Sequence, residues 1–448
     1  MNSVAERVQN RPEQERERDD GRVRYRLVSA LENPYVIALV AFLVRMVLIY
    51  IRQTYIPYYW GGNPGFGLET GSIARSVAAG EGFSSPFLDI PTGPTAWIAP
   101  VYPYLCAAVF KVFGIYTMQS HIAILGLNSV FSAFTAVVLY RIANRLFDRT
   151  VALGTAWTWA LCPYLMIWPA AWVWEISLSA LLMSSLVLLA LRVVEAPTLR
   201  RWVEFGGVYG LAALTNPAIL AVLPVMGTWA AVKLWKTKRL TLKHVFVSAL
   251  VFWVVITPWL VRNRVVLGRW EFIRDNFPLE FRIGNYVGAS GMGWAQFHPV
   301  NNAKLMREYR EKGELGFLDA RRSYPGEFIR QHTREFINIT GKRIRAFWDG
   351  ESLNYSRSKH DFWQKWTFTT FSGLALMGYL LAIGNRVHAS WLMVLVTLLY
   401  PIPYYITYAQ TRYRHAVEPI MTLAICYFLV EFVRRANFRW HSLRNRAC

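Results

Sequence analysis

Residues 168–192 read WPAAWVWEISLSALLMSSLVLLALR, with three tryptophans, one carboxylate, and then an apolar run that ends at an arginine. Tryptophan is enriched where a membrane meets water, and an apolar helix of about 20 residues crosses the bilayer. Glu175 stands at the junction between the tryptophans and the apolar run. The stretch therefore predicts a membrane-spanning helix that carries an acidic side chain at one end.

The apolar character of this stretch extends over most of the chain. Of the 448 residues, 54% are hydrophobic and only 17% are charged, whereas a soluble domain has about 25% charged residues. The expected fold class is therefore an all-α polytopic membrane protein. Apolar blocks predict ten spans, near 34–53, 120–140, 150–171, 176–194, 202–217, 218–235, 244–262, 366–384, 389–408 and 414–433.

The net charge of +21 is typical of proteins that bind nucleic acid. Here, however, most lysines and arginines lie in short segments between the apolar blocks, as the positive-inside rule requires of a membrane protein. We therefore expect a lipid bilayer and no nucleic acid as partner. The cysteines show neither metal-binding spacing nor a disulfide framework.

The distribution of positive charge also predicts the orientation. The short segments on the side of the N-terminus are the basic ones, so both termini are expected in the cytoplasm of a cell whose inner (plasma) membrane holds the protein. This requires that residues 98–114, which contain Pro100, Pro103 and Lys111, form a helix at the surface rather than a span.

Five regions follow from this threading. They are a cytoplasmic basic tail (1–33), an N-terminal transmembrane module (34–262) with an outer loop at 54–118, a periplasmic domain (263–365), C-terminal transmembrane helices (366–435) and a cytoplasmic tail (436–448). Because every inner loop is short, any chemistry is expected on the outer face.

Two acidic residues are placed for such chemistry. Glu69 precedes the predicted short helix 70–79, and Glu175 opens a span. A carboxylate at a helix N-terminus is also stabilised by the helix dipole alone, by about 0.5 kcal/mol. The functional interpretation makes both residues catalytic, with Glu69 as a general base or metal ligand.

Arginines at the outer ends of spans are the second signal, because they oppose the charge rule. Arg412 and Arg414 flank Tyr413 before the last span, and Arg262 lies where another span ends. The guanidinium group binds phosphate through two parallel hydrogen bonds. We expect all three arginines to bind a phosphate, although one ideal helix would point Arg412 and Arg414 to opposite sides.

Three weaker candidates complete the set. Asn216, in Thr-Asn-Pro, either caps a helix or contacts a substrate together with Tyr413. His298 is a candidate metal ligand, and with Glu69 and Glu175 it would hold a divalent cation. Arg45 lies inside the first span, where a charge is functional by default or pairs with a carboxylate such as Glu418.

The arrangement resembles the GT-C glycosyltransferases, and most closely the bacterial protein-mannosyltransferase-like branch that uses dolichyl- or polyprenyl-phosphate sugars. The resemblance covers most of residues 34–435. It rests on Glu69 with Ile73-Ala74-Arg75 and Gly80-Glu81-Gly82-Phe83, on Pro103-Tyr104, Phe113-Gly114 and Glu175, and on Pro258-Trp259 through Arg262-Asn263. The family commonly has aspartate where this chain has Glu69 and Glu175.

The resemblance implies a transferase that moves a hexose or pentose from a polyprenyl-phosphate donor to a hydroxyl of a protein, lipid or glycan, with inversion. Glu69 would take the proton of the acceptor, and Glu175 would orient the acceptor or hold a cation. The arginines would bind the donor phosphate. A transporter or flippase for an anionic substrate is the alternative, and it predicts charges at the bilayer midplane and related broken helices. A non-catalytic scaffold is the third interpretation, and it predicts no shared site for Glu69, Glu175 and Arg412.

Overall fold

The computed structural model of the chain describes residues 29–57, 65–87, 90–291, 293, 295–350 and 359–447. Most of the predicted tail 1–33, and parts of the segments 54–118, 263–365 and 436–448, lie outside the described residues. In the described part the chain is helical, and its one extended pairing is an isolated bridge between Ser84 and Pro94. The all-α prediction is confirmed.

The N-terminal helices begin at side-chain caps. Asn33 accepts a hydrogen bond from the Tyr35 amide at the start of α3 (Pro34–Ile51). Thr117 and Asp148 do the same for α6 (Met118–Leu146) and α7 (Arg149–Leu161). Such caps satisfy amide groups that have no partner in the first turn. These helices therefore begin where the sequence supplies an oxygen acceptor.

A proline bends the next span. Helix α7 meets α8 (Pro163–Ala171) at an angle of 49°, because Pro163 lacks the amide proton that would continue the helix. Arg45, fully buried in α3, donates to the carbonyls of Trp159 and Ala160 at this break, at 2.9 and 3.0 Å. Arg45 therefore caps the end of α7, and it does not pair with Glu418.

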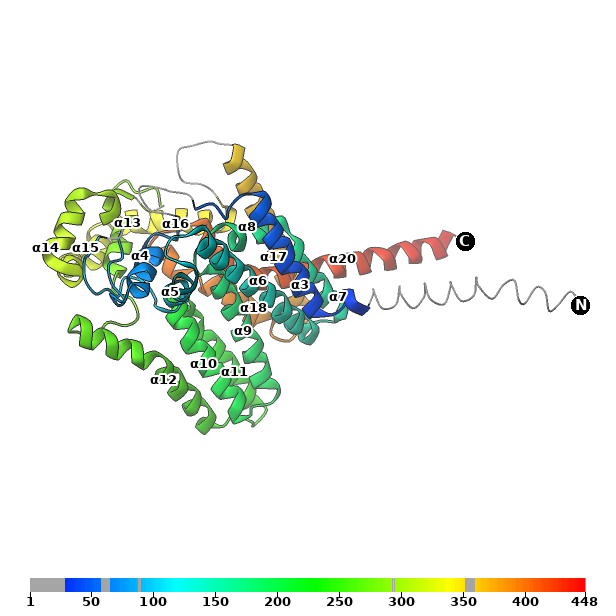
Figure 1. Cartoon of the computed structure of the whole chain (residues 1–448). Helices are drawn as coiled ribbons and strands as arrows, with labels where there is room; N and C mark the ends of the chain where they lie inside the picture. Colours follow the sequence, from blue (N-terminus) through cyan, green and yellow to red (C-terminus); the bar gives the residue numbers. More distant parts are fainter. Residues whose placement is uncertain are drawn as a thin grey trace, which may run out of the picture.

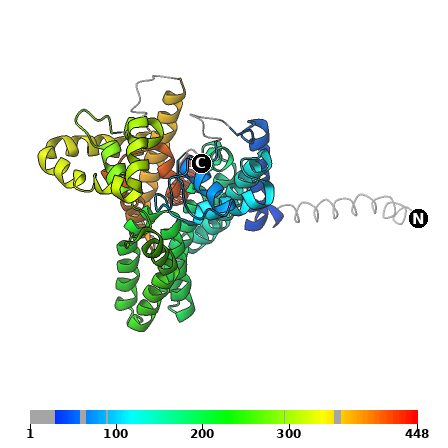
Figure 2. The same cartoon turned by 60° about the vertical axis from the view of Figure 1, so that its left-hand side comes forward.

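Helix α9 (Ile176–Glu195) is the central span, with 83% of its apolar window buried inside the molecule. A second break, at Asn216, separates α10 (Leu199–Thr215) from η1 (Pro217–Val222), and α11 (Leu223–Lys236) follows. Figures 1 and 2 show α10, α11 and α12 (Leu242–Leu267) side by side, projecting together from the bundle.

The C-terminal part contains α17 (Lys359–Gly384), α18 (Ser390–Leu399), α19 (Ile402–Ile406), η4 (Thr411–Ala416) and α20 (Glu418–Ala447). Six described helices are long and apolar enough to cross a membrane, or seven if the bent pair α7–α8 is one span. The protein is thus a multi-pass membrane protein. The expected count of ten is not confirmed, because α10 and α18 are short and charges end the apolar part of α20.

The remaining helices gather at one end of the molecule, opposite the C-terminus (Figure 1). From the first loop these are α4 (Glu69–Ala78) and α5 (Val101–Phe113). From the second outer segment they are α13 (Phe277–Gly284), η2 (Ala295–Phe297), η3 (Pro299–Asn301), α14 (Ala303–Asp319), α15 (Tyr324–Gln331) and α16 (Thr333–Asp349). With 13 residues, α5 is too short to be counted as a span.

The two segments share a hydrophobic core in which Phe87 and Trp97 pack with Leu279, Tyr309 and Phe317. We call this end of the molecule the loop end. The first loop and the second outer segment therefore form one packed unit above the spans.

Candidate functional site

A close backbone contact brings the two predicted acidic residues together. Gly67 has a φ of +80°, and a Cβ atom built on it would lie 2.2 Å from the carbonyl oxygen of Val173. Only glycine fits such an approach and such a φ angle. The buried Asn128 of α6 donates to the Trp172 carbonyl at 3.0 Å and fixes the other side of the contact. Glu69 and Glu175 each follow this contact by two residues.

A second contact brings in the segment before Arg412. A Cβ on Gly284 would lie 2.1 Å from the Thr407 carbonyl oxygen, so the end of α13 lies directly on this backbone. The fully buried Arg343 of α16 donates to the carbonyls of Tyr405 and Ile406 at 3.1 and 3.0 Å. The second outer segment thereby holds the approach to η4 in place.

Glu69 pairs with His298, whose Nε2 lies 3.2 Å from Glu69 Oε1, and both side chains are mostly buried. Burial alone would raise the pKa of Glu69. The hydrogen bond from His298, together with the positive charge of Arg412, outweighs burial and lowers this pKa below its ordinary value. Glu69 is therefore ionised at neutral pH.

The pKa of Glu175 is shifted in the opposite direction, above its ordinary value. Burial raises its pKa, the charges of Arg412 and Arg274 oppose that rise, and the negative charge of Glu69 adds to it. Two neighbouring carboxyl groups with pKa values shifted in opposite directions are typical of sites where one acts as a base and the other donates a proton or hydrogen bond.

Arg412 interacts with both carboxyl groups, because its positive charge acts to lower the pKa of Glu69 and of Glu175. Its guanidinium lies over the Trp174 ring, 4.1 Å from the centroid. The Arg412 Nε atom is buried, and no described residue accepts a hydrogen bond from it. A buried N–H donor without an acceptor is costly, and an anionic ligand would satisfy it.

Arg274 is a site residue that the sequence interpretation missed. Its side chain donates to the Trp97 carbonyl at 3.2 Å and to Glu280 at 3.4 Å, and its charge acts on Glu175. It comes from the segment between α12 and α13, where Trp259 of α12 donates to the carbonyl of the preceding residue, Ile273, at 2.9 Å. No pattern in the sequence distinguishes Arg274 from the other arginines of this segment.

Asn216 is connected to the site by contacts with tyrosine side chains. Its amide nitrogen lies 3.2 Å from the Tyr400 hydroxyl and 3.4 Å from that of Tyr404. The Tyr404 ring stacks on Tyr413, with centroids 4.1 Å apart and planes within 14°. Asn216 therefore belongs to a polar and aromatic layer that supports Tyr413.

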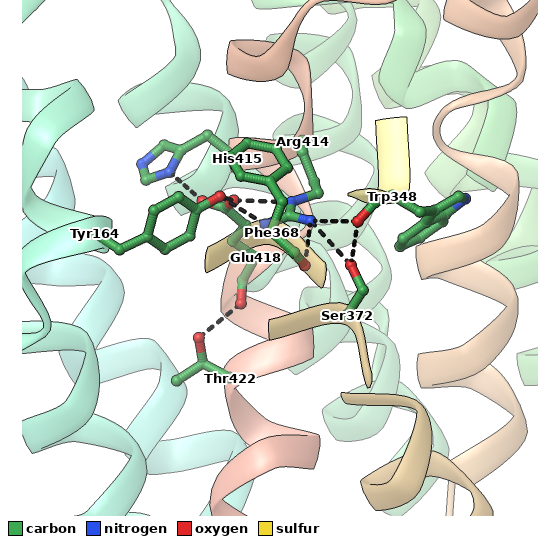
Figure 3. Close-up of polar contacts among 8 residues, drawn as sticks. All are labelled: Tyr164, Trp348, Phe368, Ser372, Arg414, His415, Glu418 and Thr422. Atoms are coloured by element: carbon green, nitrogen blue, oxygen red, sulfur yellow. Dashed lines mark hydrogen bonds and ion pairs between the residues drawn. The ribbon is translucent and has the colours of Figure 1, made fainter. Parts of the chain in front are cut away.

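Arg414 takes part in a different set of polar contacts, with Tyr164, Ser372 and Glu418 (Figure 3). It is fully buried and donates to Glu418 at 3.1 Å, to the Tyr164 hydroxyl at 2.7 Å and to Ser372 at 2.9 Å. The carbonyl of Trp348 also accepts from it. The expected phosphate contact is not supported, because all three guanidinium nitrogens of Arg414 already have protein acceptors.

Arg262 also has another role. Its two terminal nitrogens donate to the carbonyls of Phe83 and Thr95, both at 2.6 Å, and its guanidinium lies over the Trp259 ring at 4.9 Å. This side chain fastens the first loop to the end of α12. The contact with phosphate expected for Arg262 stays a prediction, because these carbonyls use only some of its five N–H donors.

The predicted cation has no complete set of ligands. Among the described residues, no three His, Cys, Asp or Glu side chains lie close enough to hold a metal ion. Glu69 and His298 form a pair. The divalent cation expected from the sequence therefore stays a prediction.

Comparisons with known proteins support the predicted resemblance. Residues 96–261 match the family model described as dolichyl-phosphate-mannose-protein mannosyltransferase. This match includes Glu175 and Asn216, and it excludes Glu69 and Arg412. A comparison with curated protein sequences finds no match.

Among solved structures, the archaeal oligosaccharyltransferase AglB from Archaeoglobus fulgidus, in complex with an inhibitory peptide and a dolichol-phosphate, gives a TM-score of 0.54 at 15% identity. The match covers 94% of this chain and 52% of AglB, so the chain spans about half the length of that protein. ArnT from Cupriavidus metallidurans, bound to undecaprenyl phosphate, gives 0.41 at 13% identity, over 87% of this chain and 77% of ArnT.

The structure therefore has the fold of a membrane oligosaccharyltransferase, which is the GT-C fold. The resemblance predicted from the sequence is confirmed, with the mannosyltransferase model matching over residues 96–261.

Proposed function

We propose that this protein is a membrane glycosyltransferase, which moves a sugar from a polyprenyl-phosphate donor to an acceptor hydroxyl. The observation that carries the proposal is the convergence of Glu69, Glu175 and Arg412. They come from three distant parts of the sequence. The charge of Arg412 acts on both carboxyl groups, and the charge of Glu69 also acts on Glu175. The family match supports the same reaction class.

Arg412 and Arg274 are the phosphate-binding groups in this proposal. Both place positive charge beside Glu175, and Arg412 has an unpaired buried donor. Charge-assisted hydrogen bonds from arginine suit a phosphate oxygen. In the reaction they stabilise the negative charge that develops on the departing polyprenyl phosphate.

Glu69 is the base. Its carboxylate takes the proton of the acceptor hydroxyl while the acceptor oxygen bonds to the anomeric carbon. The bond from that carbon to the phosphate oxygen breaks, and the phosphate leaves with the electron pair. Attack from the side opposite the phosphate inverts the anomeric centre, as in inverting glycoside hydrolysis with an alcohol in place of water.

Glu175 is the orienting acid. Burial favours its neutral form, which donates a hydrogen bond to the acceptor or to the donor phosphate. No step is assigned to a divalent cation, and the described residues contain no group of three His, Cys, Asp or Glu side chains that could hold one.

We further propose that this site faces outward, with both termini in the cytoplasm. The basic short loops support this orientation. The site then lies on the membrane side where the second outer segment, residues 263–365, forms the predicted periplasmic domain.

The test is turnover of labelled polyprenyl-phosphate sugars by the purified protein in lipid nanodiscs, with a short alcohol or peptide acceptor. Glu69→Gln is compared with Glu81→Gln, which changes an exposed carboxylate of the same loop. We expect the Glu69 variant to lose at least about 100-fold in kcat, as removal of a general base does. The Glu81 variant should retain wild-type turnover.

Equal turnover by wild type and Glu69→Gln would contradict the role of Glu69. Absence of turnover on every donor, together with substrate-dependent movement of the lipid across the bilayer, would favour the transporter alternative.

A further inference from the structure

We propose that His298 is a positioning residue, which holds the Glu69 carboxylate in its reactive orientation from the second outer segment. The inference rests on the proposed function, because it assigns Glu69 the role of base. It changes the role expected for His298 from metal ligand to hydrogen-bond donor.

The hydrogen bonds of His298 define its tautomer. Nδ1 accepts from the backbone amide of Val300 at 3.3 Å, so it carries no proton. A neutral imidazole then has its one proton on Nε2, and Nε2 lies 3.2 Å from Glu69 Oε1. His298 therefore donates to Glu69 without needing to be charged.

The His298 ring has little freedom to turn away. Its edge-on contacts with Phe87 and Trp97 place the ring centroids 5.3 and 5.9 Å apart, with planes at 86° and 90°. The next residue, Pro299, is buried and begins η3. The imidazole is thus fixed by packing as well as by hydrogen bonds.

The elements that carry the two partners are themselves joined. Glu314 of α14 is buried and accepts from the Ala96 amide at 2.6 Å, from the Thr95 hydroxyl, and from the Tyr309 hydroxyl at 2.7 Å. This ties the helix that follows His298 to the part of the first loop that precedes Trp97. The loop end therefore sets the distance between the imidazole and the carboxylate.

The chemical consequence concerns the two carboxylate oxygens. Oε1 of Glu69 is engaged by His298, which leaves Oε2 to take the acceptor proton. Without that hydrogen bond the carboxylate can rotate about its terminal torsion, which is broad. Fewer bound molecules then have the base aligned with the acceptor hydroxyl.

The test uses two substitutions that separate the two hydrogen bonds. His298→Asn keeps an acceptor for the Val300 amide, since asparagine is a good N-cap, but its side chain is too short to reach Glu69. His298→Gln places an amide nitrogen where Nε2 lay, and it keeps the donor to Glu69. His332→Asn, a substitution elsewhere in the outer segment, is the matched control.

We expect His298→Asn to lower kcat about 10- to 100-fold, with KM for the donor within about twofold, because only alignment is lost. His298→Gln should recover kcat to within about fivefold of wild type. In a Glu69→Gln background, His298→Asn should cause no further loss, as expected of a residue that acts through Glu69.

Any of four results would overturn the inference. They are normal turnover by His298→Asn, an additive loss in the double variant, glutamine as damaging as asparagine, or turnover that requires a divalent cation bound through His298. A wild-type protein without turnover refutes the proposed function, whereas normal turnover by His298→Asn refutes only this inference.

Discussion

Arg412 and Arg414 show how two residues of one type, two positions apart, acquire different roles. The 3₁₀ turn of η4 directs Arg412 toward Trp174 and the two acidic residues, and it directs Arg414 into the bundle. The sequence marked both as exceptions to the charge rule. The sequence could not tell which of the two turns toward the acidic residues, because that depends on partners far away in the chain.

Removing Arg412 should change both binding and pH dependence. In Arg412→Met we expect KM for the donor to rise about tenfold or more, since a charge-assisted contact with phosphate is lost. The charge of Arg412 lowers the pKa of Glu69 and of Glu175, so both pKa values should rise without it. Because Glu69 acts as its ionised form, the acidic limb of kcat/KM should move to higher pH.

The measurement is a pH profile of kcat/KM for wild type, Arg412→Met and the control Arg264→Met. Arg264 is exposed at the loop end of α12 and donates to the Gly268 carbonyl. An unchanged acidic limb in Arg412→Met would show that this arginine does not act on Glu69.

Removing Arg414 should instead destabilise the protein. The substitution Arg414→Met leaves Glu418 buried with Tyr164 and His415 but without its cation. Breaking one side of a buried ion pair costs about 3–5 kcal/mol. We therefore expect a clearly lower Tm in detergent for Arg414→Met, while Arg412→Met melts close to wild type.

If the two variants had equal Tm values, the division of roles between Arg412 and Arg414 would be wrong. Arg414→Met with Glu418→Leu is the informative third variant. It removes the uncompensated carboxylate and should regain part of the lost Tm.

At the scale of elements, the glycine before α4 decides whether the acidic residues meet. In Gly67→Ala the new methyl group would lie against the Val173 carbonyl, at a φ that alanine also disfavours. We expect this variant to fold but to lose most of its turnover, because Glu69 is displaced from Glu175.

Gly82→Ala is the matched control for that prediction. Gly82 has a φ of +75° and belongs to the same loop, but nothing lies within 4 Å of a Cβ built on it. It therefore carries the same backbone strain without the clash. If both variants lost the same activity in the turnover assay, strain rather than the contact with Val173 would be responsible.

The helices also show which structural features can be predicted from the sequence. Long apolar runs predicted most spans, including α9, which begins directly after Glu175. The short helix at Glu69 was also predicted. The proline break in α7–α8 and the helices of the second outer segment were not predicted as such. Their positions depend on packing and on buried arginines such as Arg343. The sequence does not indicate which groups such an arginine contacts.

The same limit applied to the candidate site. Glu175 and Arg412 were selected from the sequence because each charge lies beside an apolar run, and Glu69 because it precedes a predicted short helix in the outer loop. Arg274 was missed and Arg262 was given another role, since hydrogen bonds to backbone carbonyls leave no signal in the sequence.

At the scale of the whole molecule, the orientation can be tested with single cysteines. After replacement of Cys106, Cys162, Cys426 and Cys448, one cysteine at Lys238 and another at Arg322 report on opposite ends, and both positions are exposed. We expect a membrane-impermeant maleimide to label intact spheroplasts at position 322 only.

Labelling at position 238 should require permeabilised membranes. The opposite pattern would place the loop end in the cytoplasm and would contradict the charge-based threading.

The close contact between Gly284 and Thr407 has a consequence for biogenesis. Glu69 is synthesised long before Arg412, so a nascent chain holds an incomplete site until the segment around Arg412 has been made. Because the backbone before Arg412 packs against Gly284, the site is complete only when the second outer segment and this later segment have packed together.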